Sequence, residues 1–149
     1  MVVMQLQISM KRLLIVGLAL LAFLLGATES LACVCNVRSL SKRTSESRIV
    51  FVGTLVKRSH ESEGGQTRWR NQFSVERYWK GTPLNEVTVF TTLDDCASWF
   101  ELGQTYLVLA YYVKDSRHLE TDTCMGTGSV DRVATDLKML GKGKRVAHH

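Results

Sequence analysis

The chain has 149 residues and a net charge of +5 at pH 7, from 19 lysines and arginines and 14 aspartates and glutamates. Residues 1–32 hold two of the basic and one of the acidic side chains, so removing them leaves 117 residues with a charge of +4. That length suits one small domain and is too short for two ordinary ones. So mild a basic excess, with acidic residues interspersed, does not predict a nucleic-acid-binding protein.

The first 32 residues follow the order of regions in a secretory signal. Two basic residues precede the uncharged apolar run 13–25, and small residues, Ser30 and Ala32, stand at the third and first positions before Cys33. A membrane-spanning helix needs about 20 apolar residues, so a permanent transmembrane anchor fits this run of 13 less well. We therefore expect a signal peptide over 1–32, cleavage between Ala32 and Cys33, and a secreted or periplasmic protein.

Lipoprotein processing is the alternative fate of this amino terminus. Bacterial lipoprotein signals also end in a small residue followed by cysteine, but leucine usually stands at the third position before the cut. Here Ser30 occupies that position, and Leu31 comes one place later. Lipidation would anchor Cys33 to a membrane and usually acylates the amine that the free form exposes.

The four cysteines are Cys33, Cys35, Cys96 and Cys124. In an oxidising compartment, this even number predicts two disulfides. A bridge between Cys33 and Cys35 would close a strained ring, so one is expected to bond Cys96 and the other Cys124. Closing loops this long stabilises a domain by at most about 4 kcal/mol per bridge.

The hydrophobic pattern predicts a mainly β domain over residues 33–140. Apolar or alternating runs indicate five strands, over 48–57, 69–79, 86–92, 105–113 and 118–123. The first should have both faces covered, and in the second Trp69, Phe73, Val75 and Trp79 share one parity. Helical spacing predicts a helix over 131–140, and a short helix is expected over 39–46.

The remaining segments are expected to be irregular. They are an exposed hairpin tip over 59–67, a connector over 93–100 tied down by Cys96, a loop over 125–129 and a basic disordered tail over 141–149. Five strands, tight turns and one or two peripheral helices predict a small five-stranded barrel of the OB type.

No catalytic constellation is evident, and we expect neither an enzyme nor a cofactor. The four histidines, His60, His118, His148 and His149, lack a metal-ligand spacing. The adjacent pair Asp94–Asp95 suits a solvated loop better than an acid/base pair. Basic and aromatic residues interleave over 68–80, which can bind single strands on an OB barrel. A core stripe with solvated basic neighbours explains them equally well, so we expect no nucleic-acid partner.

Several motifs nevertheless occur in a characteristic order. They are Cys33-X-Cys35 after the signal, the strand 49–53, the turn Tyr78-Trp79-Lys80-Gly81, Cys96 followed by Phe100-X-X-Gly103-X-X-Tyr106-Leu107-Val108, and Leu119 leading into Cys124. From Cys33 to about Leu140, this set resembles the netrin-like (NTR) domains. The resemblance is closest to the inhibitory domain of the tissue inhibitors of metalloproteinases and to small bacterial proteins like it.

The resemblance implies an OB-type barrel and the pairing Cys33–Cys96 with Cys35–Cys124. It also implies that the α-amine and carbonyl of Cys33 chelate the zinc of a metalloendopeptidase, while Val34 enters its specificity pocket. Asp94, Asp95 and Ala97 would flank this contact. The zinc would belong to the partner, and this chain would need no metal of its own.

The chemistry of Cys33 suits that role. An α-amine has a pKa of about 7.7 to 8.0, so a useful fraction is neutral near pH 7 and can bind zinc. The alternative is a non-inhibitory, disulfide-stabilised NTR-like binding module in which both amino-terminal cysteines are only structural. In either case we expect no membrane contact unless Cys33 is lipidated.

Overall fold

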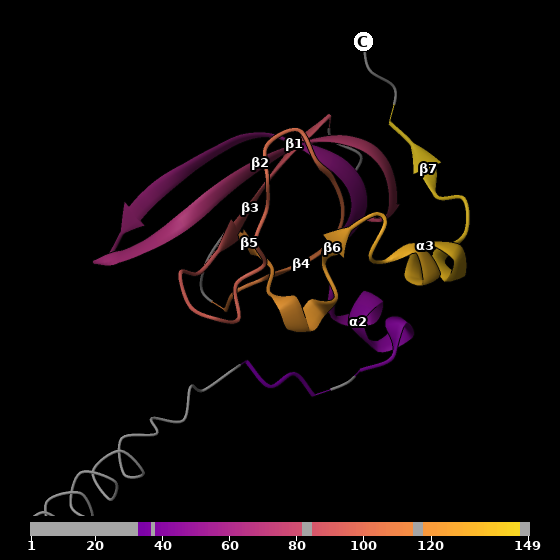
Figure 1. The fold of residues 1–149 in the computed structure, drawn as a ribbon, viewed down its shortest axis with the longest axis horizontal. Coiled ribbons are helices and arrows are strands. Elements are labelled where there is room, and N and C mark those ends of the chain that lie inside the picture. The colour runs from indigo at the N-terminus through magenta and orange to yellow at the C-terminus, as the bar shows by residue number, and fades with distance from the viewer. Residues whose placement is uncertain (1–32, 37, 82–84, 115–117, 147–149) are drawn as a thin grey trace, which may run out of the picture. The chain divides into compact units, whose positions relative to one another are not determined.

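The computed structural model describes residues 33–36, 38–81, 85–114 and 118–146 (Figure 1). The chain divides into two units, 1–32 and 33–149, and every described residue belongs to the second. The expected signal peptide, residues 1–32, lies outside the described residues. Within the described part, no helix is long and apolar enough to cross a membrane.

Five strands form a closed ring. They are β1 (Ile49–Glu63), β2 (Gln66–Lys80), β3 (Glu86–Thr91), β4 (Thr105–Tyr112) and β5 (Leu119–Glu120). Strand β1 pairs with both β2 and β4, β2 pairs with β3, and β5 closes the ring between β3 and β4. Only the β3–β5 pair is parallel. The expectation of a mainly β, five-stranded OB-type barrel is therefore confirmed.

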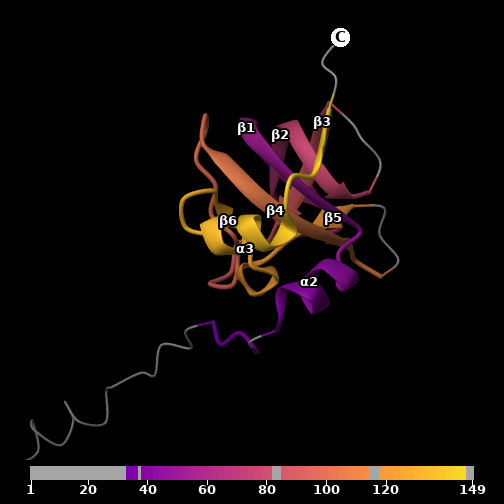
Figure 2. The ribbon, with the colours of Figure 1, turned by 90° about the vertical axis from the view of Figure 1, so that its right-hand side faces the viewer.

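Shorter elements surround the ring. They are α2 (Leu40–Glu46), the 3₁₀ helix η1 (Thr123–Met125), β6 (Gly128–Ser129), α3 (Ala134–Leu140) and β7 (Lys144–Arg145). Strand β6 extends the pairing of β4, and β7 that of β2. Figure 2 shows α2 and α3 side by side next to the barrel. The short amino-terminal helix begins as expected, because Ser39 caps it with a side-chain bond to the Lys42 N–H.

The apolar run at the start of β1 is buried on both faces, as expected. One parity, including Phe51 and Leu55, enters the barrel interior with Phe73 and other aromatic and branched side chains. The other parity, Val50 and Val52, packs outside the barrel. That outer cluster also contains Leu107, Leu109 and Met125 and is covered by Leu40, Leu137 and Leu140 of the two helices. A continuous hydrophobic run is thus required at this strand.

Gly53 lies where the register between β1 and β2 shifts. A Cβ atom at this position would lie 2.6 Å from the backbone oxygen of Ser74 and 3.2 Å from the ring of Phe51. Only glycine allows the two strands to approach this closely, so the register shift at Gly53 has a steric reason.

The expected parity of β2 is wrong at its end. Phe73 and Val75 face the interior, but Trp79 packs on the outer cluster, and its neighbour Tyr78 takes the interior position. The cause is a bulge at Glu76, since Val75 pairs with Gly53 whereas the next paired residue of β2 is Arg77. One extra residue in a strand moves every later side chain to the opposite face.

The hairpin tip is shorter than expected. Strands β1 and β2 pair as far as Glu63 and Gln66, which leaves only Gly64 and Gly65 for the turn. Both glycines have positive φ, 60° and 79°. Polar residues from 59 to 67 therefore belong to a two-stranded ribbon, in which cross-strand pairs replace burial as the stabilising contact.

The segment after residue 140 is ordered up to Val146, contrary to the expected disordered tail. The Nε1 atom of Trp79 donates to the Gly141 oxygen at 3.2 Å, β7 pairs with β2, and Val146 packs against the interior cluster. Residues 147–149 lie outside the described part. Helix α3 begins at Ala134, three residues later than predicted, and the expected loop over 125–129 contains β6.

Candidate functional site

The amino-terminal Cys-X-Cys is bonded to two distant segments. Cys33 bonds Cys96, and Cys35 bonds Cys124, with Cα atoms 5.1 Å apart in each pair. This is the pairing that the resemblance implied, and it is now confirmed. Two crosslinks one residue apart hold residues 33–35 against the barrel, so their backbone cannot swing away from it.

The two receiving segments are themselves joined. Ala97 and Asp122 form an antiparallel bridge, and the backbone oxygen of Cys96 accepts from both the N–H and the hydroxyl of Thr123, each at 3.0 Å. Three pieces of chain, 33–36, 96–97 and 122–124, therefore form one platform, which we call the cysteine platform.

Asp122 stabilises this platform from below. Its Oδ1 atom accepts from the Met125 N–H at 2.9 Å and so caps η1, which carries Cys124. Its Oδ2 atom accepts from the Tyr111 hydroxyl at 3.0 Å. Burial, and then the charge and hydrogen bond of Asp122, raise the pKa of Tyr111 well above its usual value. The neutral phenol remains a donor throughout the physiological pH range.

Val34 is the most exposed large hydrophobic residue among those described, with 92% of its surface accessible. No hydrogen bond within the described part of the chain involves its backbone. An apolar side chain that projects into solvent buries no surface and therefore does not stabilise the fold. Its position instead suits insertion into a partner's pocket.

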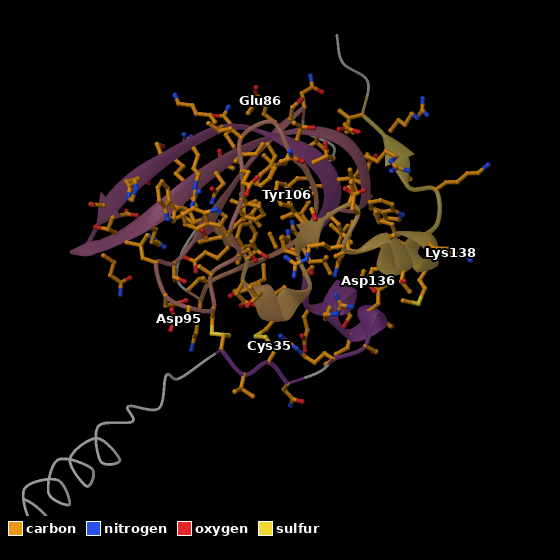
Figure 3. The ribbon with its side chains drawn as sticks, in the orientation of Figure 1. Cys35, Glu86, Asp95, Tyr106, Asp136 and Lys138 are labelled. Atoms are coloured by element: carbon orange, nitrogen blue, oxygen red, sulfur yellow. A yellow bond between two sulfur atoms is a disulfide. The ribbon has the colours of Figure 1, made fainter. Side chains whose placement is uncertain are left out.

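The flanking residues expected from the sequence take different roles. Asp94 forms a local turn, because its Oδ1 atom accepts from the Cys96 N–H and its backbone oxygen from the Ala97 N–H, both at 3.1 Å. Ala97 is half-buried, and its backbone belongs to the bridge. Asp95 is exposed, and Figure 3 places it at the same end of the barrel as Cys35. Within the described structure the Asp95 carboxylate forms no ion pair or hydrogen bond, whereas Asp94 uses one carboxylate oxygen for its turn.

Several large apolar side chains are exposed, a feature that the sequence did not reveal. Besides Val34, the connector between β3 and β4 exposes Leu93, Trp99 and Leu102 by 53%, 65% and 64%. Phe100, in contrast, is buried in the interior. The adjacent pair Trp99–Phe100 could have indicated an exposed aromatic residue, since two neighbouring side chains in an irregular segment seldom face the same way.

Trp99 is held in place by Arg58. The guanidinium carbon of Arg58 lies 3.7 Å from the ring centre of Trp69 and 4.0 Å from that of Trp99, and Nη1 donates to the Phe100 oxygen at 2.9 Å. Burial lowers the pKa of Arg58. This cation–π stack connects the β1–β2 ribbon to the connector and fixes an otherwise exposed indole.

A groove of about 880 Å³ begins at the cysteine platform. Its lining includes Cys35, Cys124 and the stretches 97–101, 126–129 and 131–133. The groove offers a partner's chain space next to Cys35.

The cysteines themselves cannot hold a metal. The sulfur atoms of Cys33, Cys35 and Cys124 lie within 4.8 Å of one another. Each belongs to a disulfide and has no thiolate to donate. The three sulfur atoms lie close together because the two disulfides pack against each other.

Comparison with known proteins does not assign a family: the sequence matches no family model, and no curated protein matches it significantly.

Proposed function

We propose that the protein is a secreted inhibitor of zinc metalloendopeptidases that acts through the backbone of Cys33 and the side chain of Val34. The observation that carries the proposal is the 92% exposure of Val34 between two cysteines, each bonded to a distant part of the barrel. The resemblance to the inhibitory NTR domains supports the same role for these residues.

The chelating chemistry depends on cleavage between Ala32 and Cys33. Cleavage frees an α-amine one carbon away from the Cys33 carbonyl, so both can bind one zinc ion in a five-membered ring. The open zinc position of a metalloprotease normally holds the attacking water. Occupying it with the amine and carbonyl removes the nucleophile, so the bound protease is inactive.

Rigidity supports tight binding. The crosslinks at Cys33 and Cys35 restrict the backbone around Val34 before any partner arrives, so little conformational entropy is lost on association. Trp99, which lines the same groove as Cys35, adds exposed apolar surface next to the cysteine platform. Asp95 supplies a charge at the margin, where it influences the association rate more than the affinity.

The decisive experiment compares two chains that differ only at the amino terminus. One begins at Cys33, and the other carries a single additional alanine before Cys33. Both are titrated against a panel of zinc endopeptidases, with serine endopeptidases as a control class. The extended chain should inhibit at least about 100-fold more weakly, because its Cys33 nitrogen is an amide and cannot chelate zinc. Equal inhibition by both chains, or inhibition of no zinc endopeptidase, would contradict the proposal.

Intact mass of the protein from an exporting host tests the prerequisite. Measured before and after reduction and alkylation, it reports the terminus and the number of disulfide-bonded cysteines together. A chain that begins at Cys33 with an unmodified amine satisfies the mechanism. A lipid-sized increment, or a different terminus, would leave no free Cys33 amine.

The connector offers a second candidate function, a binding module that needs no free amine. The observation that favours it is the exposed Trp99, which Arg58 fixes in a connector that also exposes Leu102. In this case the alanine-extended chain would bind its partner as well as the chain that begins at Cys33, whereas Trp99→Ala would weaken both equally.

A further inference from the structure

We propose that the surface around β7 and the end of α3 binds anionic phospholipid membranes. We call this surface the basic patch, and its members are Arg77, Lys138, Lys142, Lys144 and Arg145. The inference goes beyond protease inhibition and does not depend on it. It also replaces the expectation that only lipidation of Cys33 would bring the protein to a membrane.

The charge of the basic patch is not compensated locally. Residues 138–146 contain four basic side chains and no carboxylate. Strand β7 places Arg145 directly opposite Arg77 on β2, and like charges in such a pair destabilise a sheet. Other arginines of this domain, such as Arg43 and Arg68, pair with carboxylates. Within the described part of the chain, no member of the basic patch forms an ion pair.

The position of β7 is enforced by packing rather than by charge. The Trp79 indole donates to the Gly141 oxygen, and a Cβ atom at Gly143 would lie 2.8 Å from the same ring. Val146 packs against the interior cluster. The fold thus holds two arginines together despite their repulsion, which an anionic ligand would relieve.

An apolar groove adjoins the basic patch. It has a volume of about 530 Å³, and its lining residues are Leu40, Ser41, Thr44, Ser45, Lys80, Met139 and Leu140. Met139, beside Lys138, is 62% exposed. The Oγ1 atom of Thr44 is buried without a hydrogen-bond partner in the described structure. An apolar side chain flanked by cations, together with an apolar groove, matches the boundary between lipid headgroups and acyl chains.

Lys80 links the groove to the basic patch. Its Nζ atom donates to the backbone oxygens of Thr44 at 2.9 Å and Ser45 at 2.8 Å, and an ammonium has a third N–H for a phosphate. Lys80 follows Tyr78, the partner of Lys144, by two residues, or about 7 Å along the strand. A lipid phosphate at Lys80 would therefore lie close to the other cations.

The basic patch and the adjoining apolar surface together favour a membrane over a soluble polyanion as the ligand. A polyanion would contact the cations and leave Met139 and the groove unused, whereas an anionic bilayer uses both. Each lysine or arginine near such a surface strengthens binding about five-fold. In Figure 3, Lys138 projects on the side of the molecule away from Asp95. A membrane bound there would leave the cysteine platform accessible.

The test is flotation with vesicles of phosphatidylcholine, with and without phosphatidylglycerol, using protein whose mass shows that residues 1–32 are absent. We expect binding only to the anionic vesicles, with loss at high salt. The variant Lys138→Glu/Lys142→Glu should bind them at least about 25-fold more weakly. The matched control Lys57→Glu/Lys114→Glu reverses two other exposed lysines and should bind within about two-fold of wild type. Wild-type binding to neither vesicle, or equal loss in both variants, would overturn the proposal.

A second variant separates lipid from polyanion. Met139→Ser should weaken binding to the anionic vesicles several-fold and leave binding to dextran sulfate unchanged, since only the bilayer contacts the apolar side chain. If Met139→Ser binds vesicles like wild type, the patch binds polyanions and the membrane assignment is wrong. Thermal unfolding of each variant checks that it folds. Unchanged inhibition of a soluble protease by these variants would show that the basic patch acts independently of the proposed inhibitory site.

Discussion

The Sγ atom of Cys33 lies 3.9 Å from the Sγ atom of Cys124, to which it is not bonded. The two disulfides therefore pack against each other, and the hydroxyl of Thr123 lies 3.8 Å from the same Cys33 sulfur. Either disulfide alone would leave residues 33–35 free to rotate about one crosslink. Their contact makes the cysteine platform a single rigid body, from which Val34 projects.

Val34→Glu should abolish inhibition without affecting stability. The exposed valine makes no contact that folding needs, but a carboxylate cannot enter an apolar specificity pocket without a large desolvation cost. Inhibition constants and thermal unfolding, measured on the same preparations, check both parts. Val56→Glu, at a residue 48% exposed on β1, is the matched control and should change neither quantity. A large fall in the melting temperature of Val34→Glu would show that Val34 is structural.

Arg43→Met should destabilise the domain by about 2–4 kcal/mol. The Arg43 guanidinium joins three elements, because it bonds the Asp136 carboxylate at 2.8 Å and the backbone oxygens of Met125 and Arg38. Its side chain is only 13% exposed, and that of Asp136 is 19% exposed. Urea denaturation of Arg43→Met, Asp136→Asn and the double variant should give a coupling energy above about 1 kcal/mol.

The exposed pair Lys42–Glu46 on α2 serves as the control for this cycle, and its coupling should stay below about 0.5 kcal/mol. Similar coupling energies for the two pairs would mean that Arg43 contributes no more than a surface ion pair.

Gly53→Ala should cost about 1–3 kcal/mol. The added methyl would lie 2.6 Å from the Ser74 oxygen, a backbone atom that can move only if β2 shifts. Gly128→Ala is a suitable comparison, since its methyl would meet only the Val133 side chain, at 3.0 Å. Chemical denaturation should rank Gly128→Ala as the milder change, and the reverse order would argue against a steric requirement at the β1 bulge.

Tyr111→Phe should reduce the loss of folding stability that occurs as the pH rises into the alkaline range. An unfolded tyrosine ionises near pH 10, whereas burial and Asp122 raise the pKa of Tyr111 in the folded protein. Above pH 10 the unfolded state therefore binds fewer protons than the folded state, and stability falls as pH rises. Unfolding free energies between about pH 9 and 11 should decline more steeply for wild type than for Tyr111→Phe. Parallel declines would contradict the raised pKa.

Local pattern was sufficient for most of the strands. The short helix after Ser39 and the doubly buried start of β1 follow from residue types at short spacing, and both are confirmed. The disulfide pairing did not follow from the cysteines alone, because spacing left two arrangements open. The family resemblance selected between them, and the structure agrees.

Side-chain direction after a bulge was not predictable from the sequence. Trp79 faces outward because one unpaired residue at Glu76 reverses the alternation, and no local signal marks that residue. The expected disorder after residue 140 was wrong for a related reason. Lys144 and Arg145 have no apolar pattern, and they form β7 only because Trp79 and the edge of β2 provide a surface for them.

The sequence by itself determined the fold class and the four cysteines, because these depend on composition and on neighbours along the chain. Cys33 and Val34 became candidate inhibitory residues through the family resemblance. Only the tertiary structure decided which surfaces these residues share. It placed Trp99 between Arg58 and solvent, and it set Arg77 opposite Arg145. Such contacts join residues far apart in the chain, and closing the barrel is the step that brings them together.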